Sequence, residues 1–323
     1  MTDPPNVLCV GLACVDFVNV AQSFPNEDSD QRGTTYYWQR GGNASNNCTV
    51  LSLMSMNVEF MGILGTSGPE AEFIESDMKS VDIVTKHCPR EDCLCPVSTC
   101  ILSQHSGSRT ILHYPRDQPQ FSYTHFKNSL QNDFSAYSLI HFEVGINIQD
   151  YCQMLECVLQ FNKHADSKSA TGTVKNRVVI SVEVEKPEIP NPELILALAD
   201  IVFISKDVAQ SQGFTDHVSA VKGMYSKCRE DACLICPWGS QGAAAMYKGE
   251  VLSSPALTDI VAVDTLGAGD TFCAGFIGHA LKGGLYTNGF NSSLIQQSLT
   301  FGCFLAGKKC SMYGYGGLKE YVC

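Results

Sequence analysis

The sequence is poor in positive charge and has no long apolar run. It contains 22 Lys and Arg residues against 33 Asp and Glu residues, a formal net charge of −11 over 323 residues. A negative surface repels phosphate backbones and anionic head groups, so nucleic acid and membranes are not expected as the main partners. No apolar stretch approaches the roughly 20 residues that a membrane-spanning helix needs, and residues 1–5 lack the basic start of a secretory signal. We therefore expect a soluble protein of the cytoplasm.

Cysteine, in contrast, is abundant, yet the 16 cysteines predict neither disulfides nor a metal site. Many lie within apolar runs, where a reduced cysteine behaves as a small hydrophobic residue. Cys233 and Cys236 have metal-like spacing, but they fall in a predicted strand, whose alternation separates the two thiols. Cys93, Cys95 and Cys100 form the densest cluster, and no nearby pair of histidines completes a zinc site. We expect no metal site built by the protein alone.

The most informative stretch is the glycine-rich segment 264–272, DTLGAGDTF. The apolar residues 260–263 before it predict a strand, and the helical spacing of apolar residues from Phe272 onward predicts a helix. Gly267, Ala268 and Gly269 then stand where a strand turns into a helix. The first amide groups of a helix lack partners within the helix, and small residues let an anion approach them. This turn is therefore a predicted anion-binding site.

Asp270 is an unusual neighbour for such a site, because a carboxylate repels an anion. A role as the general base for a substrate hydroxyl would justify its position. The simpler alternative is that Asp270 caps the N-terminus of the helix, which aspartate often does. From these residues alone, both interpretations stay open.

Two further stretches place polar groups at the ends of predicted elements. Residues 7–15 form a nearly continuous apolar run, which predicts one buried strand of a parallel sheet. Asp16 ends this run, where open α/β sheets place ligand-binding groups, although a surface loop is the simpler interpretation. Gly42, Asn43 and Asn46 open a predicted helix. Glycine admits a ligand, and asparagine both donates and accepts hydrogen bonds, so this combination suits a neutral polyol.

The order of the remaining segments predicts the fold class. Strand-like and helix-like segments alternate from residue 139 onward, which indicates a mostly parallel sheet flanked by helices. A small antiparallel sheet is predicted from residues 34–38 and from a hairpin of residues 97–102 and 110–113. The polar segment 163–176 is predicted to be a surface loop.

The small sheet is expected to act as a lid within a single domain. We predict one domain over residues 1–323, with the lid taken from about 17–40 and 97–123. Arg109, at the end of the predicted hairpin, is the only Lys or Arg residue within this sheet. A solvated charge at a strand edge is the simpler interpretation of Arg109.

Two other glycine patterns do not predict phosphate sites by themselves. Residues 302–308 match most of a Walker A pattern, but Lys309 stands where the magnesium-binding Ser or Thr should be. The apolar interior of that segment predicts a packed helix. Residues 239–242 are not a dinucleotide fingerprint, because no helix follows them.

Taken together, these motifs resemble the ribokinase-like (PfkB) carbohydrate kinases. The segment 264–272 is similar to the C-terminal signature of that family, and Gly41-Gly42-Asn43-Ala44 with Asn46 is similar to its N-terminal signature. Stretches at 181–187, 205–209 and 306–310 are similar to the family members that phosphorylate fructose with ATP. The resemblance covers nearly the whole chain. It implies a ribokinase-like, Rossmann-type fold with a β-sheet lid that also forms a homodimer contact.

The resemblance also implies roles for particular residues. Asp270 would be the general base, beside the backbone of Gly267, Ala268 and Gly269. The residues that would hold the sugar are Asp16, Gly42, Asn43 and Asn46, with Asp28 reaching the sugar of the neighbouring subunit. The residues that would contact the nucleotide are Arg109, Gly239, Ser240, Gln241, Gly242 and Cys303.

The implied reaction is ATP-dependent phosphorylation of D-fructose at its 1-hydroxyl. Mg²⁺ would enter bound to ATP, and K⁺ is a further candidate cofactor. The segment 205–208, SKDV, departs from the Asn-x-x-Glu magnesium motif of the wider family. Two alternatives stay open: another kinase of this family that acts on ribose, adenosine or another nucleoside, and a sugar- or nucleotide-binding protein of the same fold without catalysis.

Overall fold

The computed structural model describes residues 4–168 and 177–322. Its centre is an eight-stranded sheet in the order β14-β13-β12-β11-β10-β9-β1-β4. From β12 to β4 all neighbours are parallel, and β13 and β14 are antiparallel to their neighbours. The strands are β1 (Asn6–Val10), β4 (Asn57–Met61), β9 (Leu139–Glu143), β10 (Val179–Val184), β11 (Ile201–Ile204), β12 (Cys233–Pro237), β13 (Ala243–Tyr247) and β14 (Glu250–Ser254). The predicted mostly parallel sheet is confirmed.

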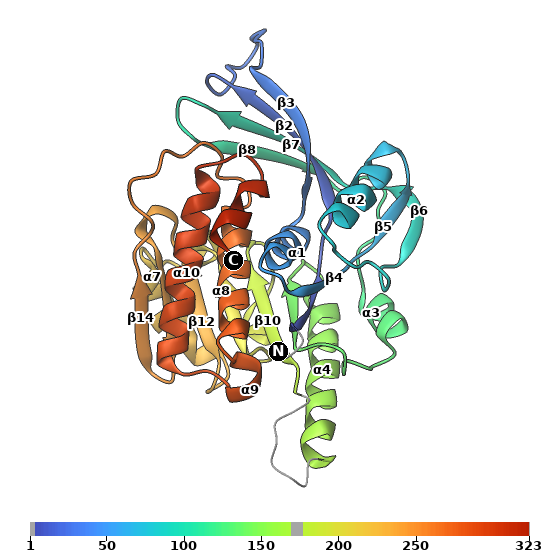
Figure 1. Ribbon diagram of the computed structural model, residues 1–323, viewed down its shortest axis with the longest axis vertical. Helices are drawn as coiled ribbons and strands as arrows, with labels where there is room; N and C mark the ends of the chain where they lie inside the picture. The colour runs from blue at the N-terminus through green and yellow to red at the C-terminus, as the bar shows by residue number, and fades with distance from the viewer. Residues whose placement is uncertain (1–3, 169–176, 323) are drawn as a thin grey trace.

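Helices bury both faces of this sheet (Figure 1). Alternate residues of β1 therefore pack into different cores: Val7 and Cys9 into one, Leu8 and Val10 into the other. Burial on both sides explains why the strands read as continuous apolar runs. The helices of the first core are α1 (Asn43–Leu53), α2 (Pro69–Ser80), α8 (Ala268–Lys282), α9 (Leu285–Asn288) and α10 (Ser292–Cys310). Those of the second are α3 (Tyr123–Leu130), α4 (Ile148–Lys168), α5 (Glu193–Leu196), α6 (Lys206–Ser211) and α7 (His217–Met224).

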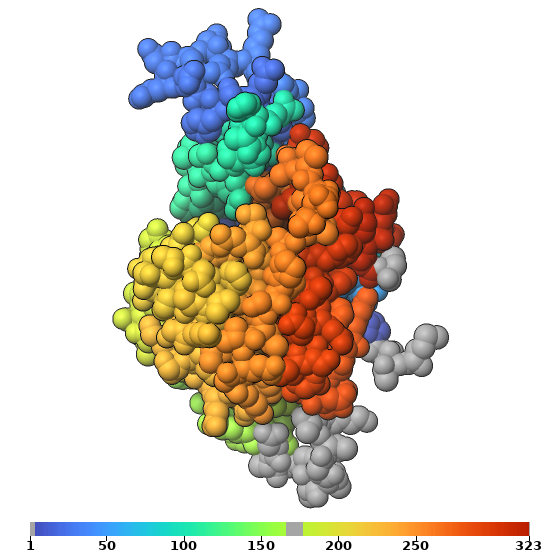
Figure 2. Space-filling view, turned by 90° about the vertical axis from the view of Figure 1, so that its left-hand side faces the viewer, coloured from blue at the N-terminus to red at the C-terminus, as the bar shows by residue number. Residues whose placement is uncertain are grey.

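A second, four-stranded sheet projects from this body and is called the lid below (Figures 1 and 2). Its order is β3-β2-β7-β8. The two outer pairs are antiparallel, whereas the central pair β2 and β7 is parallel. The strands are β2 (Cys14–Ala21), β3 (Thr35–Gly41), β7 (Val97–Ser103) and β8 (Arg109–Tyr114). The predicted small sheet, with its hairpin of β7 and β8, is confirmed.

A third pairing completes the strand structure. Strands β5 (Leu64–Ser67) and β6 (Arg90–Leu94) form a two-stranded parallel sheet beside α2. Within the two described ranges, no helix is long and apolar enough to cross a membrane.

The apolar run 7–15 is two strands in different sheets, not the single strand predicted. The chain leaves the main sheet after β1 and enters the lid at Cys14. The carboxylate of Glu143 accepts the amide of Leu12 at 2.9 Å and holds the connection between the two strands. Asp16 therefore lies inside β2 and not at the end of a strand. Apolar composition alone could not reveal this bend, because both strands are buried.

The predicted strand at 260–263 is wrong as well. These residues form no strand, and Val261 is 80% exposed. The amide of Val263 donates to the carbonyl of Cys310 at 2.7 Å, so the segment is tied to the end of α10 and not to a sheet. The predicted loop at 163–176 is also wrong in part, because 163–168 continue α4. Polar residues fit a helix whose face meets water. Residues 169–176 lie outside the described residues.

Candidate active site

The predicted sugar and base residues, with the exception of Asp28, lie near the carboxyl edge of the main sheet, where α1 and α8 begin. Helix α1 starts after Gly42, which has φ +94°. A Cβ at that position would stand 2.1 Å from the carbonyl O of Leu12, so only glycine fits. Helix α8 starts after Gly267, which has φ +74°. Two signature glycines thus allow the backbone to enter both helices, as their positions in the sequence indicated.

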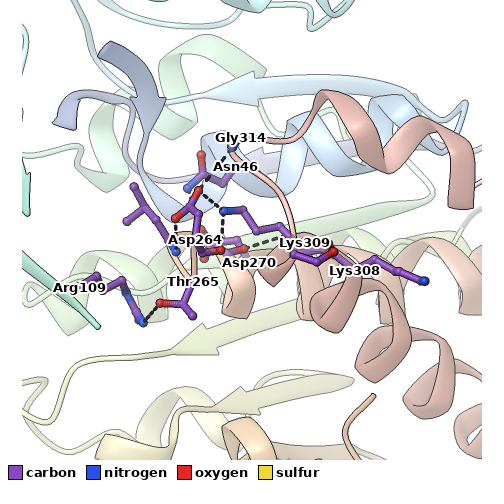
Figure 3. A network of polar contacts seen from close by, with 12 residues as sticks. Asn46, Arg109, Asp264, Thr265, Asp270, Lys308, Lys309 and Gly314 are labelled. Atoms are coloured by element: carbon purple, nitrogen blue, oxygen red, sulfur yellow. Dashed lines mark hydrogen bonds and ion pairs between the residues drawn. The ribbon is translucent and has the colours of Figure 1, made fainter. Parts of the chain in front are cut away.

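Asp270 is the third residue of α8, and its side chain is buried. Its Oδ2 accepts a hydrogen bond from Nδ2 of Asn46 at 2.7 Å (Figure 3). The N-cap of α8 is Gly267 and not Asp270. The capping alternative is therefore wrong, and the carboxylate is directed at the polar start of α1.

Burial raises the pKa of the Asp270 carboxyl well above its usual range, and the charge of Glu183 raises it further. The hydrogen bond from Asn46 opposes this rise. A carboxylate with a raised pKa holds a proton more firmly, which makes it a stronger base towards a hydroxyl group. The site thus contains a carboxylate with the property that general-base catalysis requires.

The turn formed by Gly267, Ala268 and Gly269, called the glycine turn below, is open on one side and packed on another. A Cβ built on Gly269 would meet no atom within 4 Å. At Gly267, in contrast, a Cβ would stand 1.9 Å from the hydroxyl oxygen of Tyr315. The amide groups of the first turn have no partner within the helix, and the helix dipole favours negative charge there. The residues present therefore fit a phosphate group.

Asn43 and Asn46 lie within the first turn of α1 and contact different acids. Nδ2 of Asn43 donates to Oε2 of Glu185 at 3.0 Å, whereas Asn46 donates to Asp270. The Oδ1 atom of Asn46 is buried and has no hydrogen-bond partner among the residues that the structure describes. An unpartnered buried acceptor is costly unless a ligand or water donates to it, so Asn46 is suited to receive a hydroxyl group.

Asp16 reaches the same region from the lid. Its side chain is buried, and its Oδ2 stands 2.3 Å from where a Cβ of Gly41 would be, directly before α1. Burial raises the pKa of Asp16, and a hydrogen bond from Ser98 opposes the rise. Asp28, in contrast, is exposed in the loop between β2 and β3. Within the described part of the chain, no hydrogen bond joins Asp28 to the other sugar candidates.

The residues predicted to contact the nucleotide lie in two groups. Nη1 of Arg109, at the start of β8, donates to Oγ1 of Thr265 at 3.3 Å, so this lid residue meets the glycine turn (Figure 3). Gly242 directly precedes Ala243, which pairs with Ser254. Sγ of Cys303 lies 3.9 Å from the carbonyl of the same Ser254.

The segment Gly239–Gln241 between β12 and β13 is an exposed 3₁₀ turn. The second group therefore combines this turn and Gly242 with α10, which carries Cys303. As predicted for residues 302–308, that segment lies in a packed helix and forms no phosphate loop.

Three acidic residues that the sequence analysis did not assign also belong to the region. Glu143 ends β9, Glu183 lies in β10, and Glu185 follows β10. Oε2 of Glu143 accepts the amides of Leu12 at 2.9 Å and Ala44 at 3.0 Å, which links β1 to α1. Acidic residues that end successive buried strands were the signal that could have revealed them.

Among the residues that the structure describes, Glu183 has no charged partner, and its buried Oε2 has no hydrogen bond. This atom lies 3.8 Å from Nε2 of His141. Burial lowers the pKa of His141 to about 4, so this imidazole is neutral at neutral pH. Burial in turn raises the pKa of Glu183, and the charge of Glu185 raises it further. Among the residues that the structure describes, no three His, Cys, Asp or Glu side chains are grouped as a ready metal site.

Comparison with known proteins gives one family over almost the full length. Residues 4–316 match the family described as "pfkB family carbohydrate kinase". Ketohexokinase of Mus musculus is 39% identical over 319 residues, which cover 97% of this chain and 98% of the relative. A fructokinase of Klebsiella pneumoniae is 35% identical over 94 residues, 29% of this chain and 30% of the relative.

Solved structures agree in fold at much lower identity. The ribokinase of Giardia lamblia superimposes with a TM-score of 0.81 at 15% identity, covering 98% of both chains. The ribokinase of Arabidopsis thaliana, complexed with ribose and ATP, gives a TM-score of 0.71 at 17% identity, covering 99% of this chain and 97% of the other. The adenosine kinase of Sinorhizobium meliloti gives 0.74 at 15% identity, covering 98% of both. The ribokinase-like fold predicted from the motifs is confirmed.

Proposed function

Since the chain belongs to the pfkB family of carbohydrate kinases, we propose that it transfers the γ-phosphoryl group of ATP to the 1-hydroxyl of D-fructose. The products are fructose 1-phosphate and ADP. The observation that carries this proposal is the buried Asp270 carboxylate, with its raised pKa, beside the glycine turn and the amide-rich start of α1. The identity to mouse ketohexokinase over nearly the whole chain supports fructose as the acceptor.

Asp270 accepts the proton of the attacking hydroxyl. The sugar oxygen forms a bond to the γ-phosphorus as the bond from that phosphorus to the bridging oxygen of ADP breaks. The hydrogen bond from Asn46, 2.7 Å long, orients the carboxylate for this transfer. General-base help of this kind accelerates reactions by about 10²–10⁴-fold.

The backbone amides of Gly267, Ala268 and Gly269 stabilise the charge on the phosphoryl group while it moves. Each preorganised donor of this type contributes about 3 kcal/mol to lowering the barrier. Arg109 adds positive charge from the lid, close to Thr265 of the same turn. Closure of the lid excludes water, which would otherwise compete with the sugar for the phosphoryl group.

The sugar is held by uncharged donors and by one carboxylate. Asn43, Asn46 and the backbone at Gly42 offer both donors and acceptors to neighbouring hydroxyls, and the unpartnered Oδ1 of Asn46 accepts one of them. Asp16, buried at the junction of lid and body, accepts hydrogen bonds from further hydroxyls. This set suits a neutral sugar better than a phosphorylated one, because added negative charge would face Asp16 and Asp270.

The residues that would hold ATP run from the glycine turn to the segment Gly239–Gln241, and Gly242 and Cys303 would lie near its adenine. Mg²⁺ bound to ATP would neutralise phosphate charge. Oε2 of Glu183, which is buried without a hydrogen bond among the described residues, would accept one from a water molecule of the ion. The chain's own residues thus bind and orient the nucleotide while Asp270 moves the proton.

We also propose that the lid joins two copies of the chain. Strand β8 is exposed along its length, and it presents Ile111, Leu112 and Tyr114 at 44%, 50% and 50% exposure. Tyr36 on β3 is 59% exposed. An apolar surface of this kind favours association. In such a homodimer Asp28 would reach the sugar of the partner, and light scattering that finds a monomer would contradict this proposal.

One assay tests the proposed reaction. ADP release is followed with fructose, ribose and adenosine as acceptors, with Mg²⁺ present and with K⁺ present or absent, and the position of the phosphate is read by ³¹P NMR. We expect fructose to be the best acceptor and the product to be the 1-phosphate. Faster reaction with ribose or adenosine would mean that fructose is not the preferred acceptor. Sugar binding without ADP release would contradict the kinase reaction.

A further inference from the structure

A buried lysine lies directly beneath the glycine turn. Lys309 of α10 is the only buried lysine within the described residues, and its side chain and that of Asp264 are both 0% exposed. Nζ of Lys309 lies 2.6 Å from Oδ2 of Asp264 and 3.1 Å from the backbone carbonyl O of the same residue (Figure 3). Removing an ammonium group from water is costly, so a lysine that serves only packing is a poor choice at this position.

Asp264 also accepts hydrogen bonds from the backbone on either side of the turn. Its Oδ1 accepts the amide of Leu266 at 2.9 Å, and its Oδ2 accepts the amide of Gly314 at 3.4 Å. The amide of Asp264 donates to the carbonyl of Cys310 at 3.2 Å. One carboxylate thus joins the start of the glycine turn, the end of α10 and the loop that follows α10.

The same lysine contacts the group that packs against Gly267. Nζ of Lys309 lies 5.6 Å from the centre of the Tyr315 ring. The hydroxyl of Tyr315 is the atom that a Cβ on Gly267 would strike. Lys309, Asp264 and Tyr315 therefore support the turn from its packed side, while Gly269 leaves the other side open.

We propose that Lys309 is a positioning residue for phosphoryl transfer. Its ammonium group, acting through Asp264, holds residues 264–269 in the conformation that directs their amides to the phosphoryl group and Asp270 to the hydroxyl. Without a cation beside it, the buried Asp264 carboxylate would lose its main compensation and would move away from the amide of Leu266. This inference rests on the proposed kinase reaction.

A second cluster of opposite charges provides a control that separates an effect on the active site from an effect on stability. Asp200 is buried, accepts the amide of Ile180 at 2.9 Å, and is paired with Arg177 at 2.6 Å and Arg229 at 2.9 Å. This cluster precedes β10, β11 and β12, at the amino edge of the sheet. Like the Lys309 cluster, it joins a buried carboxylate to a cation and to a backbone amide, although its Arg177 and Arg229 side chains are 33% and 31% exposed and Lys309 is fully buried. It lies at the opposite end of the strands from Asp270.

The experiment compares Lys309→Met with Arg229→Met. We expect both to lower the melting temperature, but only Lys309→Met to lower kcat, by about 10²-fold, the size of a lost transition-state donor. The KM for fructose should change by less than about threefold, since the sugar pocket is untouched. NH₄⁺ should restore part of the lost kcat in Lys309→Met, because the Met side chain is one heavy atom shorter than that of Lys and leaves room for this ion beside Asp264. The ion should not help Asp270→Asn.

A double variant covers the case in which Lys309→Met does not fold. Lys309→Met with Asp264→Asn removes both charges, and replacing a buried ion pair by neutral groups is often tolerated. We expect it to fold and to keep the low kcat. A wild-type kcat in the double variant, or in a folded Lys309→Met, would overturn the role of Lys309. So would a loss of kcat in Arg229→Met equal to that in Lys309→Met.

A binding measurement keeps the two proposals distinguishable. Calorimetry with the ATP analogue AMP-PNP and Mg²⁺ should show weaker binding for Lys309→Met and unchanged binding for Arg229→Met. Absence of ADP release by the wild type would contradict the proposed reaction alone. Equal AMP-PNP affinity in the wild type and Lys309→Met would contradict the positioning role, whatever the acceptor.

Discussion

Acids at the amino edge and at the carboxyl edge of the main sheet have different partners. At the amino edge, Asp200 is compensated by two arginines and a backbone amide. At the carboxyl edge, the buried Asp270 and Glu183 and the partly buried Glu143 lie close together, so that the charges of Glu183 and Glu143 raise the pKa of Asp270 and the charge of Glu143 raises that of Glu183. Within the described part of the chain, their hydrogen bonds come from backbone amides, from Asn46 and from the thiol of Cys273, and none comes from a cation.

This difference in partners distinguishes an acid that supports the fold from acids that are suited to catalysis. The two arginines compensate the charge of the buried Asp200, so this cluster supports the fold. Carboxylates that lie together without a paired cation lower the free energy of unfolding, but one of them becomes a better base. The glycine turn between them is an exception, because Lys309 neutralises Asp264 there. Substitutions at the two edges should therefore have different signatures.

The largest expected effect is on turnover in Asp270→Asn. We expect kcat to fall by about 10²–10⁴-fold because the proton acceptor is lost, while fructose affinity changes far less. Asp200→Asn at the amino edge is the control, and it should lower the melting temperature with kcat unchanged. Steady-state kinetics and a thermal melt decide the matter, and near-normal turnover in Asp270→Asn would refute its role as base.

A smaller effect, on the KM for ATP, is expected for Arg109→Gln. Loss of a charged donor near Thr265 should raise the KM for ATP by about 10–100-fold, as expected for a hydrogen bond to a charged group, and should leave the KM for fructose nearly unchanged. Arg229→Gln serves as the matched control at the other edge. If Arg109→Gln raised the KM for fructose and not that for ATP, its assignment to the nucleotide would be wrong.

Asn46→Ala should shift the pH dependence of turnover. The hydrogen bond from Asn46 lowers the pKa of Asp270, so its loss should raise that pKa and move the acid limb of kcat to higher pH. The wild-type limb itself should lie above the range of an ordinary Asp, because only the ionised carboxylate accepts a proton. A pH–rate profile with the limb unmoved would mean that Asn46 does not act on Asp270.

The smallest effect is on stability as a function of pH. The folded protein binds protons at Asp270 and Glu183 more tightly than the unfolded chain, because both pKa values are raised. These groups therefore lower stability as pH rises through the interval between the unfolded and folded pKa values. Asp270→Asn should raise the melting temperature at neutral pH by a few degrees, about 1 kcal/mol, and the gain should shrink in acid. A gain independent of pH would point to another cause.

The sequence predicted the local backbone at the candidate site because local chemistry carried the signal. The glycines at 42 and 267 need positive φ, and Asn43, Asn46 and Asp270 follow them at the start of helices. Such features depend on neighbours within a few residues, so they can be read along the chain. The lid hairpin and the packed helix at 302–308 were predicted for the same reason, from alternation and apolar composition.

The residues that could not be predicted depend on distant partners. Asp16 was placed at the end of a strand, because nothing in the run 7–15 reveals that Glu143, far along the chain, holds the bend after β1. Residues 260–263 have strand composition but no sheet neighbour. Lys309 was dismissed with a false phosphate loop, although burial against Asp264 gives it an ionic contact.

By itself, the amino-acid sequence determined the parallel α/β class and the two glycine-led helix starts, and it singled out Asp270 as a candidate base. Only the tertiary structure decided which acids lie together without a paired cation and which are paired, because Asn46 and Asp270 are 224 positions apart and meet only when the chain between them folds. Charge and hydrogen bonding act through space over a few ångströms, whereas sequence patterns report spacing along the chain.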